Sequence, residues 1–192
     1  MRSPEVSAEG KAALEPLLAV ARASIAWGLQ SGAPLEVEAS RFDPVLQQAR
    51  ASFVTLHADD ELRGCTGSLV AHRPLVVDVT RNAFAAAFLD PRFPPLRSHE
   101  LASLHLHVSV LGPQEPVEVE TESELLARLR PGVDGLVLEE GACRATFLPA
   151  VWAQLPTPEA FLQHLKRKAG LPPGHWSQTI RFWRYAVEAV EE

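Results

Sequence analysis

An α+β fold is the class that the sequence predicts, on three observations. Short runs that alternate apolar and polar residues, such as residues 52–57 and 104–111, indicate strands. Longer stretches carry apolar residues at helical spacing. The regular strand–helix–strand alternation of a parallel sheet is missing, so we expect an antiparallel sheet flanked by helices, with a smaller subdomain.

Two helices and an arm are expected in the first half of the chain. Residues 9–30 have the pattern of an amphipathic helix, which Pro16 would kink or divide. Residues 35–50 show no clear period and predict an extended arm that leads into a short turn of helix. Residues 74–89 give the clearest helix, with proline at its start. Its polar residues Asp78, Arg81 and Asn82 are expected on the surface.

A hairpin is expected between these helices. Residues 52–57 alternate like a strand, and the polar Asp59-Asp60-Glu61 provides the reversal. The second strand then carries Leu62-Arg63-Gly64-Cys65-Thr66-Gly67-Ser68-Leu69. Glycines in a strand mark a bulge or a close approach to the backbone. Cys65 can therefore be a reactive, ligand-facing thiol or a small buried residue, and this stretch alone leaves both interpretations open.

A stiff connector follows the second helix. Asp90-Pro91-Arg92-Phe93-Pro94-Pro95-Leu96 is too rich in proline to continue a helix. A rigid segment can hold Arg92 ready for a carboxylate or a phosphate, although local pairing with Asp90 is an equal alternative. We expect this connector to pack beside the cysteine hairpin and to line the same cleft.

The second half returns to strands and short helices. Residues 135–148 predict a second hairpin across Glu140-Gly141, and residues 157–169 predict a helix capped by Thr157. The other expected elements are a strand over 104–111, an edge strand over 117–120, helices over 123–129 and 149–155, and a carboxy-terminal strand over 179–190.

Composition narrows the class of protein. The 192 residues, 46% hydrophobic and 22% charged, fit one domain over 1–192, with room for a small subdomain. A net charge of −6 argues against a nucleic-acid binder. Apolar runs such as 83–89 are too short for a bilayer, and residues 1–6 lack the apolar core of a secretory signal. We therefore expect a cytoplasmic protein that contacts neither membrane nor nucleic acid.

Familiar catalytic and cofactor motifs are absent from the sequence, including phosphate-binding loops and zinc-protease motifs. Two cysteines, Cys65 and Cys143, are too few for a disulfide scaffold or an iron–sulfur cluster. His105 and His107 have a spacing that can bind a metal, but no third ligand lies nearby in sequence. We expect no metal site and no cofactor.

Taken in order, these segments resemble the AMMECR-type domain, the A component of the AmmeMemoRadiSam system. The segments that carry the resemblance are LRGCTGSL, DPRFPPL, the strand around Val108-Ser109-Val110-Leu111, Gly135-Leu136-Val137-Leu138, Thr146-Phe147-Leu148-Pro149 and Lys168-Ala169-Gly170-Leu171. The resemblance extends over about residues 12–190. It implies an α+β fold and association with a Memo-type protein and a radical S-adenosylmethionine (SAM) enzyme, but it implies no established reaction.

Two hypotheses follow for the cysteine motif, in which the resemblance places Arg63, Gly64, Cys65 and Gly67. In the first, the protein is an enzyme or enzyme subunit with Cys65 as nucleophile in a cleft. Arg63 would then lower the pKa of the thiol or hold an anionic group of the substrate, and the N–H groups of Gly64 and Gly67 would face an oxyanion. Arg92 would bind a carboxylate or a phosphate of the same small molecule. His57 or His107 would be the base. In the alternative, the same surface belongs to a non-catalytic ligand-binding or partner module.

Overall fold

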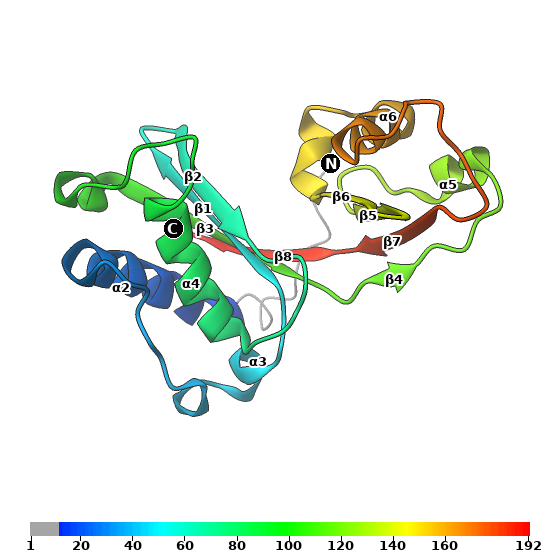
Figure 1. The fold of residues 1–192 in the computed structure, drawn as a ribbon. Coiled ribbons are helices and arrows are strands. Elements are labelled where there is room, and N and C mark those ends of the chain that lie inside the picture. The colour runs from blue at the N-terminus through cyan, green and yellow to red at the C-terminus, as the bar shows by residue number, and fades with distance from the viewer. Residues whose placement is uncertain (1–11) are drawn as a thin grey trace. The chain divides into compact units, whose positions relative to one another are not determined.

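The structure, a computed structural model, describes residues 12–192. These residues form two compact units, the first made of residues 12–111 with 188–192 and the second of residues 112–187. Each unit has a four-stranded sheet and its own apolar core (Figure 1). The α+β class predicted from the sequence is confirmed.

The sheet of the first unit has the strand order β2-β1-β3-β8. Its strands are β1 (Ser52–Ala58), β2 (Glu61–Gly67), β3 (Leu104–Leu111) and β8 (Val187–Glu191). On β1, Val54 and Leu56 are fully buried, whereas Thr55 and His57 are partly exposed. One face of the sheet therefore packs on the core, as the alternation predicts, and β2 is an edge strand.

Helices α2 (Pro16–Ser31) and α4 (Leu75–Phe88) pack against this sheet and against each other (Figure 1). Helix α4 contacts β1 and β2, and α2 contacts β3. The shorter elements of the unit are a 3-10 turn at Ala39–Arg41, α3 (Pro44–Gln47) and a 3-10 helix at Ser98–Ser103. The predicted helix over 74–89 and the predicted hairpin are both confirmed. Residues 9–11 of the first predicted helix lie outside the described residues.

The helical stretch Ala12–Ser31 is long and apolar enough, by length and composition, to cross a membrane. A search for unbroken apolar runs misses it because polar residues interrupt the stretch. Its Leu17, Ala21 and Ile25 are fully buried in the core of the first unit, as in the core helix of a soluble protein. The chain is thus a soluble-type α+β protein with no clear membrane character.

The second unit has the strand order β4-β7-β5-β6. Its elements are β4 (Glu115–Pro116), α5 (Glu122–Arg128), β5 (Gly135–Glu140), β6 (Cys143–Phe147), a 3-10 helix at Pro149–Ala153, α6 (Pro158–Lys168) and β7 (Arg181–Tyr185). The ring of Phe161 stacks on Trp152 with centroids 3.9 Å apart, which anchors α6 in this core. The Thr157 hydroxyl caps α6 as predicted, by accepting the N–H of Ala160.

Three sequence-based boundaries are wrong. The edge strand lies at Glu115–Pro116 instead of 117–120, because the chain turns into the α5 cap at Thr121. The helix expected over 149–155 is a 3-10 helix that ends at Ala153. The carboxy-terminal strand is two strands, β7 and β8, which belong to different sheets. No proline or glycine marks the break at Ala186, so the sequence does not reveal it.

Candidate functional site

The thiol of Cys65 lies on the face of the first unit's sheet that points away from the core. Cys65 pairs with Thr55 on β1, and the Thr55 hydroxyl donates a hydrogen bond to its Sγ at 3.3 Å. The side chain of Cys65 is partly exposed. The thiol is thus neither fully buried nor without a polar partner, and its ligand-facing role stays a prediction.

The connector closes the free edge of β2 at Cys65. The Cys65 N–H donates to Asp90 Oδ2 at 2.9 Å, and Arg92 Nη2 lies 3.4 Å from the Cys65 carbonyl oxygen. Arg92 also donates to both carboxylate oxygens of Asp90, from Nε at 3.0 Å and from Nη2 at 2.7 Å. A carboxylate and a guanidinium therefore take the place of a neighbouring strand. The predicted packing of this connector beside the hairpin is confirmed, whereas a cleft lined by both segments stays a prediction.

Asp90 and Arg92 differ in their access to solvent. The Asp90 side chain is 3% exposed, and hydrogen bonds from Arg92 and from the Cys65 N–H hold the pKa of this carboxyl well below its usual range. The Arg92 side chain is 54% exposed. Its pKa is raised, chiefly by Asp90 and in smaller part by the Cys65 thiol. The local pairing of Arg92 with Asp90 is confirmed, and binding of a carboxylate or phosphate by the exposed guanidinium stays a prediction.

Arg63 is occupied by other partners. Its Nε donates to Glu100 Oε1 at 2.7 Å and its Nη2 donates to the carbonyl oxygen of Pro94 at 3.0 Å. The hydrogen bond from Arg63 lowers the pKa of Glu100. The guanidinium groups of Arg63 and Arg92 both lie over the ring of Phe93, at 5.9 and 5.4 Å from its centroid. Anion binding by Arg63 stays a prediction, and Arg92 is the better-placed cation.

Close packing explains why the motif has glycine at positions 64 and 67. A Cβ on Gly64 would lie 2.1 Å from the carbonyl oxygen of Ala86 on α4, and one on Gly67 would lie 2.2 Å from the ring of Phe53. Helix and ring therefore approach the strand from opposite faces, as glycine in a strand indicates. Because N–H directions alternate along a strand, the Gly64 N–H points to β1 while that of Cys65 points to the free edge. Oxyanion binding at the two glycines stays a prediction.

The histidines lie on the same face as the thiol. Thr55 pairs with Cys65 on one side and with His107 on the other. His57 pairs with His105 and lies two residues from Thr55 along β1. Burial lowers the pKa of His107, and His57 lowers it slightly further, while Glu191 raises it. No group of three potential metal-binding side chains occurs within residues 12–192.

Comparison with known proteins fits this arrangement. A protein-family model described as AMMECR1 matches residues 18–190, which include the whole cysteine motif and the connector. The chain belongs to the AMMECR1 family. This assignment agrees with the resemblance that the motifs indicate.

Relatives of this AMMECR1 chain come from archaea and bacteria. Protein MJ0810 of Methanocaldococcus jannaschii is 37% identical over 155 residues, which cover 79% of this chain and 77% of that protein. Protein MK0488 of Methanopyrus kandleri is 36% identical, with 93% and 87% covered. The crystal structure of an uncharacterized protein, PH0010, from Pyrococcus horikoshii matches with a TM-score of 0.85 at 33% identity, covering 95% of this chain and 92% of that one. These matches support the fold and the family.

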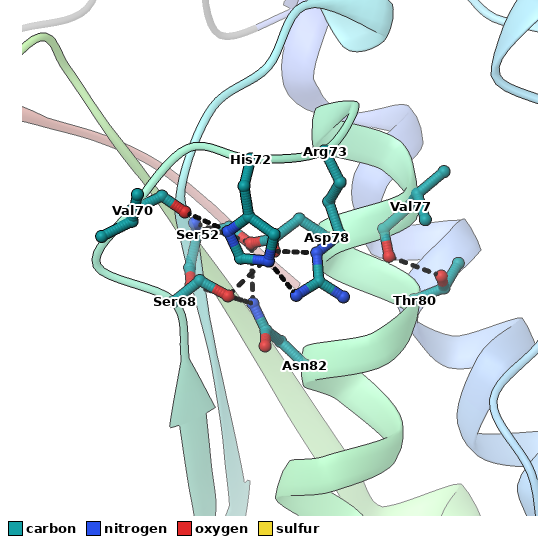
Figure 2. Close-up of polar contacts among 9 residues, drawn as sticks. All are labelled: Ser52, Ser68, Val70, His72, Arg73, Val77, Asp78, Thr80 and Asn82. Atoms are coloured by element: carbon teal, nitrogen blue, oxygen red, sulfur yellow. Dashed lines mark hydrogen bonds and ion pairs between the residues drawn. The ribbon is translucent and has the colours of Figure 1, made fainter.

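A second polar cluster, missed in the sequence, lies where β2 ends. Asp78 and Asn82 of α4 are buried instead of exposed, whereas Arg81 is exposed as predicted. Asp78 Oδ2 accepts the N–H and the hydroxyl of Ser52, at 3.0 and 2.7 Å, and the amide of Asn82 at 2.8 Å. Its Oδ1 accepts the hydroxyl of Ser68 at 2.9 Å (Figure 2). Asp78 and Asn82 are four residues apart and so share one face of the helix, which was the available signal.

Arg73 completes this cluster from the loop before α4. Its Nε lies 3.2 Å from Asp78 Oδ1, and a nitrogen of His72 contacts its guanidinium (Figure 2). With so many donors around it, the Asp78 carboxylate has little capacity left to act as a base. The cluster therefore holds the start of β1 and the end of β2 against α4, and so positions the cysteine strand.

The hydrogen bonds that Asp90 accepts from Arg92 and from the Cys65 N–H, here called the Asp90 clamp, predict a pH-dependent stability. Because the folded-state pKa of Asp90 is depressed, its contribution is present above the ordinary value of 3.8 and is lost as pH falls through the lowered value. We expect Asp90→Asn to reduce the free energy of unfolding at pH 7 by about 2 kcal/mol. The difference from wild type should shrink as pH falls below about 4. Urea unfolding at several pH values measures it, and a difference that stays constant down to pH 2 would contradict the clamp.

Proposed function

We propose that this protein is an enzyme subunit that binds a small anionic molecule at Cys65, with the thiol as nucleophile and Arg92 as the cation that holds the anion. The observation that carries the proposal is the half-exposed guanidinium fixed at the carbonyl of a partly exposed cysteine. Thiolates are the nucleophilic form of cysteine, and a neighbouring cation favours them. The Thr55 hydroxyl adds a donor to the sulfur.

The chemical step is a displacement at an electrophilic atom of the anion. The Cys65 thiolate supplies the electron pair of the new bond, and the leaving group departs with the pair of the broken bond. Arg92 orients the anion through its remaining exposed N–H groups, while Asp90 keeps the guanidinium from swinging away. No change of oxidation state is needed.

The proposal extends to partners and compartment through the resemblance. We propose that the protein acts in the cytoplasm with a Memo-type protein and a radical SAM enzyme, one of which supplies or consumes the anion. Co-expression of the three chains, purification through one tag and mass analysis of any bound molecule test this. We expect an anion that remains with wild type and is lost in Cys65→Ala. Recovery of the same molecule from the variant would contradict the role of the thiol.

A second candidate, a non-catalytic partner module, is favoured by two exposed apolar side chains near the site. Leu89, directly before Asp90, is 65% exposed, and Leu62 on β2 is 40% exposed. Exposed leucines beside a motif suit protein docking. Under this alternative, Leu89→Ser would weaken association with the Memo-type or radical SAM partner, whereas Cys65→Ala would leave association and partner activity unchanged.

A reactive thiol at Cys65 predicts a difference in alkylation rate between the two cysteines. Both are partly exposed, so access alone does not separate them, but Cys143 packs at the edge of the second unit's core. We expect limited iodoacetamide treatment followed by peptide mapping to label Cys65 at least about tenfold faster than Cys143. Cys143 should react as an ordinary thiol, which is only a few per cent ionised at pH 7. Faster labelling of Cys143 would contradict the proposed function.

A further inference from the structure

A row of polar side chains crosses the exposed face of the first unit's sheet. Thr55 on β1 pairs with Cys65 on β2 and with His107 on β3. The neighbouring residues of β1 and β3, Leu56 and Leu106, are buried in the core, so Thr55 and His107 point to the opposite face. Cys65, Thr55 and His107 thus lie side by side across three strands.

Thr55 is the link in this row. Its hydroxyl already donates to Cys65 Sγ at 3.3 Å. Directly opposite residues in an antiparallel pair have Cβ atoms about 4.5–5.5 Å apart, which places the His107 imidazole within reach of the hydroxyl, directly or through one water. Neither His57 nor His105 pairs with a residue that touches the sulfur.

The surroundings of His107 suit a base. Burial disfavours its protonated form and lowers its pKa, so the imidazole is neutral and able to accept a proton at pH 7. Two ionisable groups on the neighbouring strands act on it, Glu191 of β8 and His57 of β1. Glu191 favours the imidazolium and so stabilises the product of proton transfer, while a charged His57 opposes it.

We propose that His107 accepts the proton of Cys65 through the hydroxyl of Thr55. The proposal rests on the proposed function, because it explains how that thiol becomes a nucleophile. The Cys65 S–H proton passes to Thr55 Oγ1 while the Thr55 hydroxyl proton passes to the imidazole, leaving a thiolate and an imidazolium. Thr55 ends as a neutral hydroxyl that donates to the sulfur, which is the hydrogen bond seen in the structure.

The test is the pH profile of Cys65 alkylation by iodoacetamide, in full-length protein that carries Cys143→Ala. We expect wild type to stay reactive down to the pH at which an imidazole becomes protonated. His107→Gln should react about tenfold more slowly at pH 7 and retain only the rise typical of an unassisted thiol, near pH 8.5. Thr55→Val should show the same loss and Thr55→Ser should restore the rate. His105→Gln, an exposed neighbour on the same strand, is the matched control and should match wild type.

Two outcomes separate this inference from the proposed function. A wild-type Cys65 that reacts no faster at pH 7 than glutathione overturns both. A fast wild type whose profile superimposes on that of His107→Gln overturns the proton relay alone. The NMR titration of His107 gives an independent reading in a variant that keeps the histidine. We expect its midpoint to fall in Cys65→Ala, since a thiolate favours the imidazolium, and an unchanged midpoint would also overturn the relay.

Discussion

Replacing Gly64 with alanine should destabilise the first unit by about 3 kcal/mol, because the added methyl group has no space. Its Cβ would lie 2.1 Å from the carbonyl oxygen of Ala86 and 3.0 Å from the carbonyl carbon, and both belong to the backbone of α4. A backbone group cannot rotate aside as a side chain can, so helix and strand must separate. Urea unfolding of Gly64→Ala measures the loss.

The matched control is Gly174→Ala, where a Cβ meets nothing within 4 Å. It should change the free energy of unfolding by less than about 0.5 kcal/mol. Equal effects of the two substitutions would show that the α4–β2 contact does not limit the choice of residue at 64. The contact matters for the site, because α4 leads directly into Asp90 and the connector.

The second large effect is expected at Asp78. Removing its carboxylate in Asp78→Ala leaves the Ser52 N–H and the Ser68 hydroxyl without their acceptor and the Arg73 guanidinium without its ion-pair partner. Loss of one partner from a buried charge cluster costs about 3–5 kcal/mol. We expect a loss of this size in urea unfolding, together with slower alkylation of Cys65 in variant protein that remains folded.

Asp43→Ala is the control for this change, since Asp43 is exposed and its side chain makes no capping hydrogen bond. It should unfold like wild type. If Asp78→Ala behaved like Asp43→Ala, the cluster would not be what holds the ends of β1 and β2 to α4.

The sequence predicts those parts of the fold whose pattern is local. Strand β3 is predicted at its observed bounds, Leu104–Leu111, because apolar and polar residues alternate in its sequence as far as Val110. The break between β7 and β8 is not predictable in this way, because no turn residue separates the two strands and they differ in their partners. The buried state of Asp78 also depends on partners distant in sequence, here Ser52 and Ser68.

The same distinction applies to the site. The proline-rich connector and the glycine-flanked cysteine are both unusual in the sequence. The structure brings these two segments together at the edge of β2. The sequence does not reveal that Asp90 supplies the contact with the strand, or that Arg63 turns to Glu100 while Arg92 stays exposed. Which of two nearby arginines remains available is decided by tertiary packing, and residue type cannot indicate it.

The central claim, an anion site formed by Cys65 and Arg92, is tested most directly by two alkylating reagents that differ in charge. The ratio of the iodoacetate rate to the iodoacetamide rate at Cys65 is measured in protein that carries Cys143→Ala. Both reagents report the same thiol, so a change in its ionisation or exposure cancels in the ratio. What remains is the attraction of the negative reagent to the neighbouring cation.

We expect the ratio in wild type to exceed that in Arg92→Gln about fivefold at low salt, corresponding to about 1 kcal/mol for one unit charge near 4 Å in water. Added salt should reduce the difference. Arg81→Gln, which removes an exposed arginine from α4, should leave the ratio at the wild-type value. Equal ratios in wild type and Arg92→Gln would contradict the anion site.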